Sequence, residues 1–356
     1  MATRTRIYLD FNATAPLADA ARAAMTAAMA AGEVGNPSSI HAEGRRARDR
    51  VERARAQVAA LVGRPAEQIV FTSGGTEANL LGLLGLARVA EQRGLPRVIH
   101  TSATHHPSLL GAIAELRARG WVVAASNAQP VGLAAYSLVN HEVGWIETVS
   151  RAGEALIHVD AVQAAGKMAL DVPFDSLAVS AHKLGGPQGV GALVMSGDGG
   201  LPLVDGGHQE RGRRSGTENV IGIVGFGAAA AAADLADWPR VAALGERLKR
   251  GLLAIDNARI TETPNQIGGT INAAFAGALG QSIVIALDLE GIAVSTGAAC
   301  TSGSVQPSPV LLASGQSAEQ AREAVRFSLG RSTTDAEIDE VLRVLPAIVD
   351  RARKHR

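Results

Sequence analysis

Gln68-Ile-Val-Phe-Thr-Ser-Gly-Gly-Thr76 is an apolar strand that ends in a glycine turn, and a helix is predicted to follow from Glu77 to about Arg93. The same order recurs along the chain. Further strands are predicted at 97–101, 121–125, 155–159 and 176–180, and a helix at 108–120. Strand–helix alternation is typical of a mainly parallel sheet covered on both faces. The sequence therefore predicts an α/β protein whose ligands collect at the carboxyl ends of the strands.

The composition excludes several classes of protein. The chain has 356 residues, of which 47% are hydrophobic and 19% charged, and its 34 basic residues balance 34 acidic ones. No basic surface for nucleic acid or a membrane is expected. The N-terminus lacks the apolar core of a signal peptide, and no run approaches the roughly 20 apolar residues of a membrane span. These features and the single cysteine predict a reduced, cytoplasmic protein.

The length predicts one large domain and a smaller one. A charged helix around 239–254 is expected to link them, and alanine-rich segments at 18–31 and 226–233 suit packed helices. Beyond the linking helix, the segments 268–274 and 287–294 and a terminal helix at 335–353 predict a second α/β layer. We place the large domain at 15–245 and the small one at 1–14 and 246–356.

Lys183 stands out because lysine is rare in this chain. Lysine occurs at four positions (167, 183, 249 and 354), whereas the other thirty basic residues are arginines. Lys183 follows an apolar strand and precedes a glycine-rich turn. An amine at such a strand end can form a Schiff base or act as a base, which a guanidinium cannot do. The plainer alternative is a surface lysine in a loop.

Two other strand ends carry candidate binding residues. The turn Ser73-Gly-Gly-Thr76 can hold a phosphate on backbone N–H groups, or it can simply be a tight turn. Asp160 can cap the following helix, or it can face a pyridine nitrogen and keep it protonated. Gln163 lies one helical turn further on and can reach the same side.

Two glycine-rich loops complete the candidates. The loop 206–219 is either a solvated surface loop or one long enough to cross into a second subunit. Cys300 lies among small and polar residues, where thiolate chemistry is possible, although a lone cysteine is more often inert.

Eight motifs occur in an order that resembles the cysteine desulfurases, pyridoxal-phosphate enzymes of the class V aminotransferase group. They are Tyr8-Leu-Asp-Phe-Asn-Ala-Thr-Ala-Pro16, Gly35-Asn-Pro-Ser-Ser-Ile-His41, Phe71-Thr-Ser-Gly-Gly-Thr-Glu-Ala-Asn79, His158-Val-Asp-Ala-Val-Gln163, Ser180-Ala-His-Lys183, Arg211-Gly-Arg-Arg-Ser-Gly-Thr217, Gly297-Ala-Ala-Cys-Thr-Ser302 and Arg326-Phe-Ser-Leu-Gly-Arg331. The resemblance is greatest to the branch that serves iron–sulfur cluster assembly and nitrogen fixation. It implies aminotransferase fold type I, with a mainly parallel seven-stranded sheet between helices and a smaller C-terminal α/β domain.

The resemblance also implies a role for each matching residue. Lys183 would be the Schiff-base lysine, Asp160 the partner of the pyridine nitrogen, and His106 the group stacked on the ring. Gln163 and His141 would contact the ring oxygen. The phosphate would be held by Gly75, Thr76, Ser180, His182 and, from the neighbouring subunit, Thr217. Arg326 would bind the substrate carboxylate, with Asn36 and His141 beside the substrate, and Cys300 would accept the sulfur. No metal is expected.

The chain departs from the family pattern in two places. The usual Asn-Asn-Glu motif is Asn140-His-Glu142 here, so His141 stands where an asparagine normally contacts the ring oxygen. Either His141 makes that contact or Asn140 takes it over after a small backbone shift. The stretch between Ala128 and Asn140 is also shorter than usual, which predicts that a helix is missing.

These observations predict a homodimeric cysteine desulfurase that converts L-cysteine to L-alanine. The sulfur would be left on Cys300 as a persulfide and passed to an acceptor such as an iron–sulfur scaffold protein. Two alternatives remain: a related aminotransferase or selenocysteine lyase, and a degenerate family member that serves as a scaffold or thiol sensor.

Overall fold

The computed structural model describes residues 6–32, 35–125, 129–197, 204–296 and 307–354. The chain divides into two compact units. We call Pro16–Val139 with Glu147–Leu235 the large unit, and Met1–Ala15 with Asn140–Ile146 and Ala236–Arg356 the small unit. The predicted strand at 176–180 is present with the same bounds.

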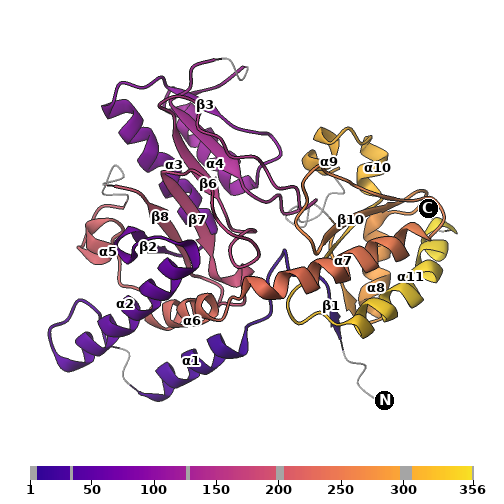
Figure 1. Cartoon of the computed structure of the whole chain (residues 1–356), viewed down its shortest axis with the longest axis horizontal. Coiled ribbons are helices and arrows are strands. Elements are labelled where there is room, and N and C mark those ends of the chain that lie inside the picture. Colours follow the sequence, from indigo (N-terminus) through magenta and orange to yellow (C-terminus); the bar gives the residue numbers. More distant parts are fainter. Residues whose placement is uncertain (1–5, 33–34, 126–128, 198–203, 297–306, 355–356) are drawn as a thin grey trace. The chain divides into compact units, whose positions relative to one another are not determined.

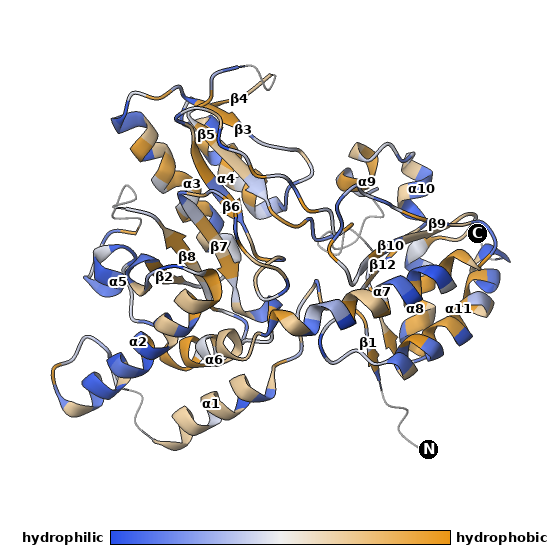
Figure 2. Ribbon diagram, viewed as in Figure 1, coloured by the Kyte–Doolittle hydropathy of each residue, from blue (hydrophilic) through white to orange (hydrophobic). Residues whose placement is uncertain are grey.

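The large unit contains the seven-stranded sheet that the resemblance implied. Its strand order is β2-β8-β7-β6-β5-β3-β4 (Figure 1). The strands are β2 (Ile69–Thr72), β3 (Val98–His100), β4 (Val122–Val123), β5 (Leu133–Ser137), β6 (Leu156–Asp160), β7 (Ser176–Ser180) and β8 (Gly191–Met195). Neighbours from β7 to β4 are parallel, whereas β8 runs antiparallel to both β2 and β7. The central strands β5, β6 and β7 are buried along their whole length and consist mainly of apolar residues (Figure 2).

Two groups of helices belong to this unit. One group is α3 (Gly75–Gln92) and α4 (Pro107–Ala118); α3 packs on β6, β7 and β8, and α4 packs on α3. The other group is α1 (Asp19–Ala30), α2 (Ala42–Val62) and α6 (Val220–Ala231), in which α1 and α2 both pack on α6. The alanine-rich segments therefore form packed helices, as predicted. The short helix α5 (Gln209–Gly212) lies in the glycine-rich loop.

The small unit is built on two small sheets. Strands β9 (Ala258–Ile260), β10 (Thr270–Phe275) and β12 (Ala324–Ser328) form an antiparallel sheet, and β1 (Ile7–Tyr8) pairs with β11 (Ile292–Ala293). The helices are α7 (Trp238–Leu253), α8 (Gly280–Leu289), α9 (Pro309–Ala313), α10 (Ala318–Arg322) and α11 (Asp335–Lys354). Among the described residues, no single helix meets the length and apolarity of a membrane span; a bent pair, Val220–Ala231 with Leu235–Leu253, does so only by length and composition.

The two units differ from the predicted domain ranges at α7 and at Asn140–Ile146. The whole of α7 belongs to the small unit because its residues Val241, Leu244 and Leu248 pack into that unit's core. The segment 140–146 joins the small unit through backbone hydrogen bonds with residues 265–267. A range drawn from composition alone does not detect such long-range pairing.

The shortened segment contains β5, which lies between β6 and β3 in the large sheet. The described residues between Ala128 and Asn140 form β5 and no helix, in line with the predicted loss. Parallel strands are usually joined by a crossover helix. Here β4 is followed by β5 after nine residues, three of which lie outside the described part of the chain. Both valines of β4 are exposed.

Candidate active site

The predicted site residues of the large unit gather where parallel strands end. β6 ends at Asp160, and β7 ends at Ser180, just before the short helix Ala181–Lys183. Lys183 and Asp160 both lie close enough to His106 for their charges to act on it. Burial lowers the pKa of His106, Lys183 lowers it further, and Asp160 opposes the shift. The imidazole is therefore held neutral near pH 7.

Asp160 uses its two oxygens differently. Oδ1 accepts the backbone N–H of Val162 at 2.9 Å, which closes a turn; no helix follows at residues 161–167, so the helix cap considered from the sequence is not formed. Oδ2 accepts Nδ2 of Asn79 at 2.8 Å. The side chain is 5% exposed, so the carboxylate is held in one orientation.

The start of α3 fits a phosphate. A Cβ on Gly75 would come within 2.7 Å of Val162 Cγ2 and 3.5 Å of Ser180 Cβ, so glycine lets the helix start approach Ser180. Its N-cap, Gly74, provides no side-chain cap. Burial, reinforced by Lys183, lowers the pKa of His182 to about 4, so His182 is a neutral donor near pH 7. Backbone N–H groups, a serine and a neutral imidazole form a donor set for an anion.

Gln163 is held by a residue to which the sequence gave no role. Lys167 is buried, and its Nζ donates to Oε1 of Gln163 at 2.9 Å. The acceptor end of the amide is thereby oriented toward Lys167, and Nε2 is the donor end. The scarcity of lysine was the available signal, because Lys167 is the second lysine close to the motifs.

The loop that carries Thr217 is anchored by a buried ion pair. Glu210 accepts from Arg55 at 2.6 and 2.9 Å and from the Phe71 N–H at 2.8 Å. Glu210 and Arg211 both have left-handed backbone angles, with φ of 50° and 59°. Non-glycine residues adopt this conformation at a cost, which the ion pair and hydrogen bonds offset.

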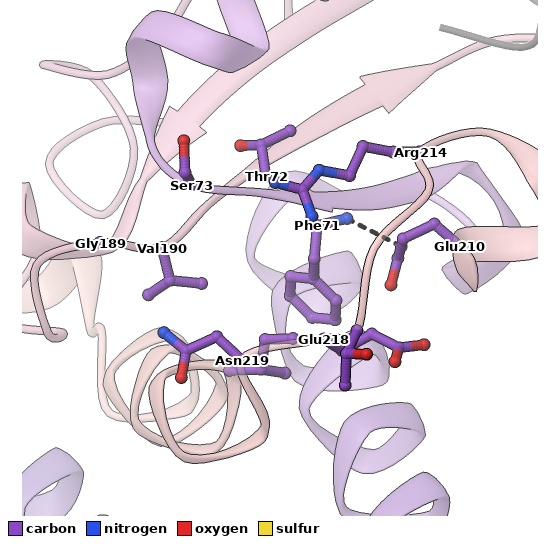
Figure 3. Close-up of a pocket in the computed structure, with 11 residues that line it drawn as sticks. Phe71, Thr72, Ser73, Gly189, Val190, Glu210, Arg214, Glu218 and Asn219 are labelled. Atoms are coloured by element: carbon purple, nitrogen blue, oxygen red, sulfur yellow. Dashed lines mark hydrogen bonds between the residues drawn. The ribbon is translucent and has the colours of Figure 1, made fainter. Parts of the chain in front are cut away.

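Thr217 lines a pocket of about 140 Å³ (Figure 3). Thr72 and Ser73 at the end of β2 lie on one side of it, and Arg214, Glu218 and Asn219 come from the loop. Arg214 donates to Glu77 at 2.8 Å. Burial opposes the ionisation of Glu77, but the hydrogen bonds from Arg214 and Ser73 prevail and lower its pKa.

Arg326 and His141 belong to a second polar cluster, in the small unit. Arg326 Nη2 pairs with Asp10 at 2.7 Å, and Nη1 donates to the His141 carbonyl at 3.1 Å. His141 Nε2 lies 3.6 Å from Oε1 of Glu142. Asn140 Oδ1 accepts the N–H groups of Glu142 and Val143, so moving Asn140 into the His141 position would break two hydrogen bonds.

For Asn36 and Cys300, the structure gives few or no contacts that bear on the predicted roles. Asn36 is exposed, and its Oδ1 accepts the Ser38 N–H at 2.9 Å. Cys300 lies outside the described residues. The roles predicted for Asn36, Cys300 and His141, like those of the other site residues, stay predictions.

Comparison with known proteins finds relatives that match nearly the whole chain. Residues 7–341 match the aminotransferase class-V family model. A cysteine desulfurase of Cereibacter sphaeroides is 40% identical, covering 98% of this chain and 97% of that protein. A cysteine desulfurase IscS of Anaeromyxobacter is 39% identical over 98% of this chain and 93% of its own length.

The solved structure of a NifS-like protein superposes with a TM-score of 0.87 at 31% identity, covering 97% of this chain and all of that one. The Cereibacter alignment extends over 379 positions, more than the 356 residues here, so the relative has residues that this chain lacks. The chain belongs to the class-V aminotransferase family, in its cysteine desulfurase branch.

Proposed function

We propose that this chain converts L-cysteine to L-alanine, with pyridoxal phosphate held at Lys183 and the sulfur left on Cys300 as a persulfide. The observation that carries the proposal is the grouping of Lys183, His106 and Asp160 at the ends of parallel strands. The anion-binding start of α3 lies beside the same strand ends. Family membership supports the same reaction.

The residues present fit the cofactor. A carboxylate fixed by two hydrogen bonds, a neutral imidazole and a phosphate-type donor set match a protonated pyridine with a phosphate group. When bound, pyridoxal phosphate would supply an aldehyde for an amine and a ring that accepts electrons. Asp160 would hold the ring nitrogen protonated, and Gly75, Thr76, Ser180 and His182 would bind the phosphate. Gln163, oriented by Lys167, would donate to the ring oxygen.

The chain's own groups would then move protons and sulfur. The Lys183 amine would take the α-proton of cysteine, and His106 would stack on the cofactor ring. Arg326 would bind the substrate carboxylate, because a guanidinium matches it in two-pronged geometry. The Cys300 thiolate would take the sulfur atom, so that cysteine and one thiol give alanine and one persulfide. A protein acceptor, such as an iron–sulfur scaffold, would receive that sulfur.

The active form would be a homodimer in which Thr217 reaches the partner's phosphate site. The support is the anchored loop: the Arg55–Glu210 pair fixes its start, while Thr217 itself is exposed. A loop whose start is fixed and whose Thr217 is exposed is suited to contact a second subunit.

The experiment is to incubate purified protein with L-cysteine and quantify alanine, sulfide and protein-bound persulfide together. Wild type is expected to produce alanine without a keto-acid co-substrate. Lys183→Ala should lose the absorbance of the lysine Schiff base and the activity, whereas Cys300→Ala should keep that absorbance and form no persulfide. Lys249→Arg is the matched control, since Lys249 pairs with Glu262 far along the sequence from these motifs.

Alternative activities give different results. Alanine formation that depends on an added keto acid would indicate an aminotransferase. Turnover restricted to selenocysteine would indicate a selenocysteine lyase. Protein that stays colourless with added cofactor would contradict the proposal and favour a scaffold or thiol sensor.

A further inference from the structure

Asn79 lies at the centre of a hydrogen-bond network for which the sequence motifs gave it no role. It is buried on α3, with 1% of its surface exposed. Its Nδ2 donates to Asp160 Oδ2 and to Ser108 Oγ, both at 2.8 Å. Its Oδ1 lies 3.0 Å from Nε2 of His158. One amide thus joins three elements: β6, α4 and α3.

The Asp160 carboxylate fixes the direction of every hydrogen bond around Asn79. A carboxylate only accepts, so the NH₂ end of the amide must face Asp160 and the carbonyl end must face His158. His158 therefore carries its proton on Nε2, and its Nδ1 accepts from Ser176 Oγ at 2.8 Å. Burial lowers the pKa of His158 to about 3, in agreement with this neutral form.

Ser108 connects the Asn79 amide to the His106 ring. Ser108 Oγ accepts one hydrogen from Asn79 and lies 2.8 Å from His106 Nδ1, to which it donates because the Ser108 backbone N–H makes that nitrogen an acceptor. The Ser108 backbone N–H donates to the same nitrogen at 3.1 Å. Nδ1 is therefore the acceptor nitrogen, and Nε2 carries the proton. Asp160 and Lys183 are the charged groups whose fields act on this ring.

We propose that Asn79 is a positioning residue that couples the Asp160 carboxylate to His106 by orienting the Ser108 hydroxyl. This deepens the proposed function, on which it rests, because Asp160 and His106 would face the same cofactor. The hydroxyl orientation adds to burial in keeping His106 neutral, because a proton on Nδ1 would face two donors, the Ser108 hydroxyl and the Ser108 backbone N–H. The electron-accepting ring would then meet an imidazole of fixed charge.

The test reverses the hydrogen-bond direction at Asn79 with little change in shape. In Asn79→Asp the oxygen that replaces Nδ2 shares a proton with Asp160 Oδ2 and accepts from Ser108 Oγ, so the Ser108 oxygen can accept from a protonated His106 Nδ1. The pKa of His106 is expected to rise by about one unit or more. It is measured by ¹⁵N NMR of full-length protein labelled at histidine, with and without cofactor, and His106→Gln assigns the signal.

A double-mutant cycle separates the hydroxyl relay from the simple addition of negative charge. If the coupling passes through Ser108, Asn79→Asp shifts the pKa of His106 much less in a Ser108→Ala background than in wild type. An equal shift in both backgrounds, or no shift in either, would overturn the proposal.

If Asn79→Asp fails to fold, the two variants Ser108→Ala and Ser108→Thr test the proposal by themselves. Ser108→Ala removes the hydroxyl donor to Nδ1 and is expected to raise the pKa of His106, whereas Ser108→Thr keeps the hydroxyl and the wild-type value. An unchanged pKa in Ser108→Ala would contradict the relay. These titrations need no L-cysteine, so their failure is distinct from a failure of the desulfurase reaction itself.

Discussion

The polar network around Asp160 and the cluster around Arg326 are both buried, but they are built from different groups. Around Asp160, a single carboxylate accepts from a connected set of neutral groups. These are the Asn79 amide, the His158 imidazole and the hydroxyls of two serines. The Arg326 cluster is built from ionisable groups: Asp10, His141, Glu142 and Arg326 itself. The Nε–H of Arg326 is buried with no acceptor among the described residues.

This difference indicates which kind of ligand each region suits. A network in which every hydrogen bond has a fixed direction holds its groups in place before any ligand arrives. A buried guanidinium with an unsatisfied N–H costs free energy until an acceptor binds. The first arrangement suits the positioning of a cofactor, and the second suits the binding of a substrate carboxylate.

The largest expected effect concerns Arg326. Arg326→Lys should lower kcat/KM for L-cysteine about 100-fold, mainly through KM, because a charge-assisted hydrogen bond contributes about 3 kcal/mol. Steady-state kinetics measure it. Arg259→Lys is the control, since Arg259 is on β9 of the same sheet, separated from the Arg326 strand by β10, and pairs with Glu323. An unchanged KM in Arg326→Lys would remove the proposed role.

A smaller effect tests whether the Asp160 network can shift. A Cβ on Gly82 of α3 would lie 2.6 Å from the His158 ring, whereas Gly111 of α4 has nothing within 4 Å. Gly82→Ala should therefore lower the free energy of unfolding by about 1–2 kcal/mol, because the clash outweighs helix propensity. Gly111→Ala should raise it by about 0.5–1 kcal/mol. Urea denaturation measures both, and stabilisation by Gly82→Ala would show that His158 moves freely.

The two regions should also respond to pH with opposite signs. The pKa of His158 falls from about 6.5 in the unfolded chain to about 3 in the fold. The stability it contributes is fully present above pH 6.5 and is lost as the pH falls toward 3. His158→Gln keeps a donor to Asn79 and removes the titration. Its unfolding free energy should therefore change less than that of wild type between pH 7 and pH 4.

Glu142 gives the opposite slope. Burial raises the pKa of Glu142 although Ser308 and Arg326 oppose the shift. The folded state therefore favours the protonated carboxyl, and stability is lost as the pH rises from about 4.3 through the folded pKa. Glu142→Gln should remove this loss, so the variant gains stability relative to wild type as the pH rises. A constant difference between the two across this range would contradict the raised pKa.

The sequence predicted those features that arise from local pattern. Apolar runs located the strands, the bounds of β7 were correct, and the motif residues Lys183 and Asp160 do lie near His106. The antiparallel β8 was not predicted, because strand direction depends on pairing with residues far along the chain. Asn79 is 81 residues from Asp160, and its role appears only when α3 packs on β6. The role of Lys167 was missed for the same reason.

The most direct test of the central claim is to identify which lysine holds the cofactor. Protein loaded with pyridoxal phosphate is reduced with borohydride, digested and mapped by mass spectrometry. The chain has four lysines, so the assignment is unambiguous. The proposed function predicts the pyridoxyl group on Lys183, since the Lys167 amine is engaged with Gln163. A pyridoxyl group on Lys167, or on no lysine, would contradict it.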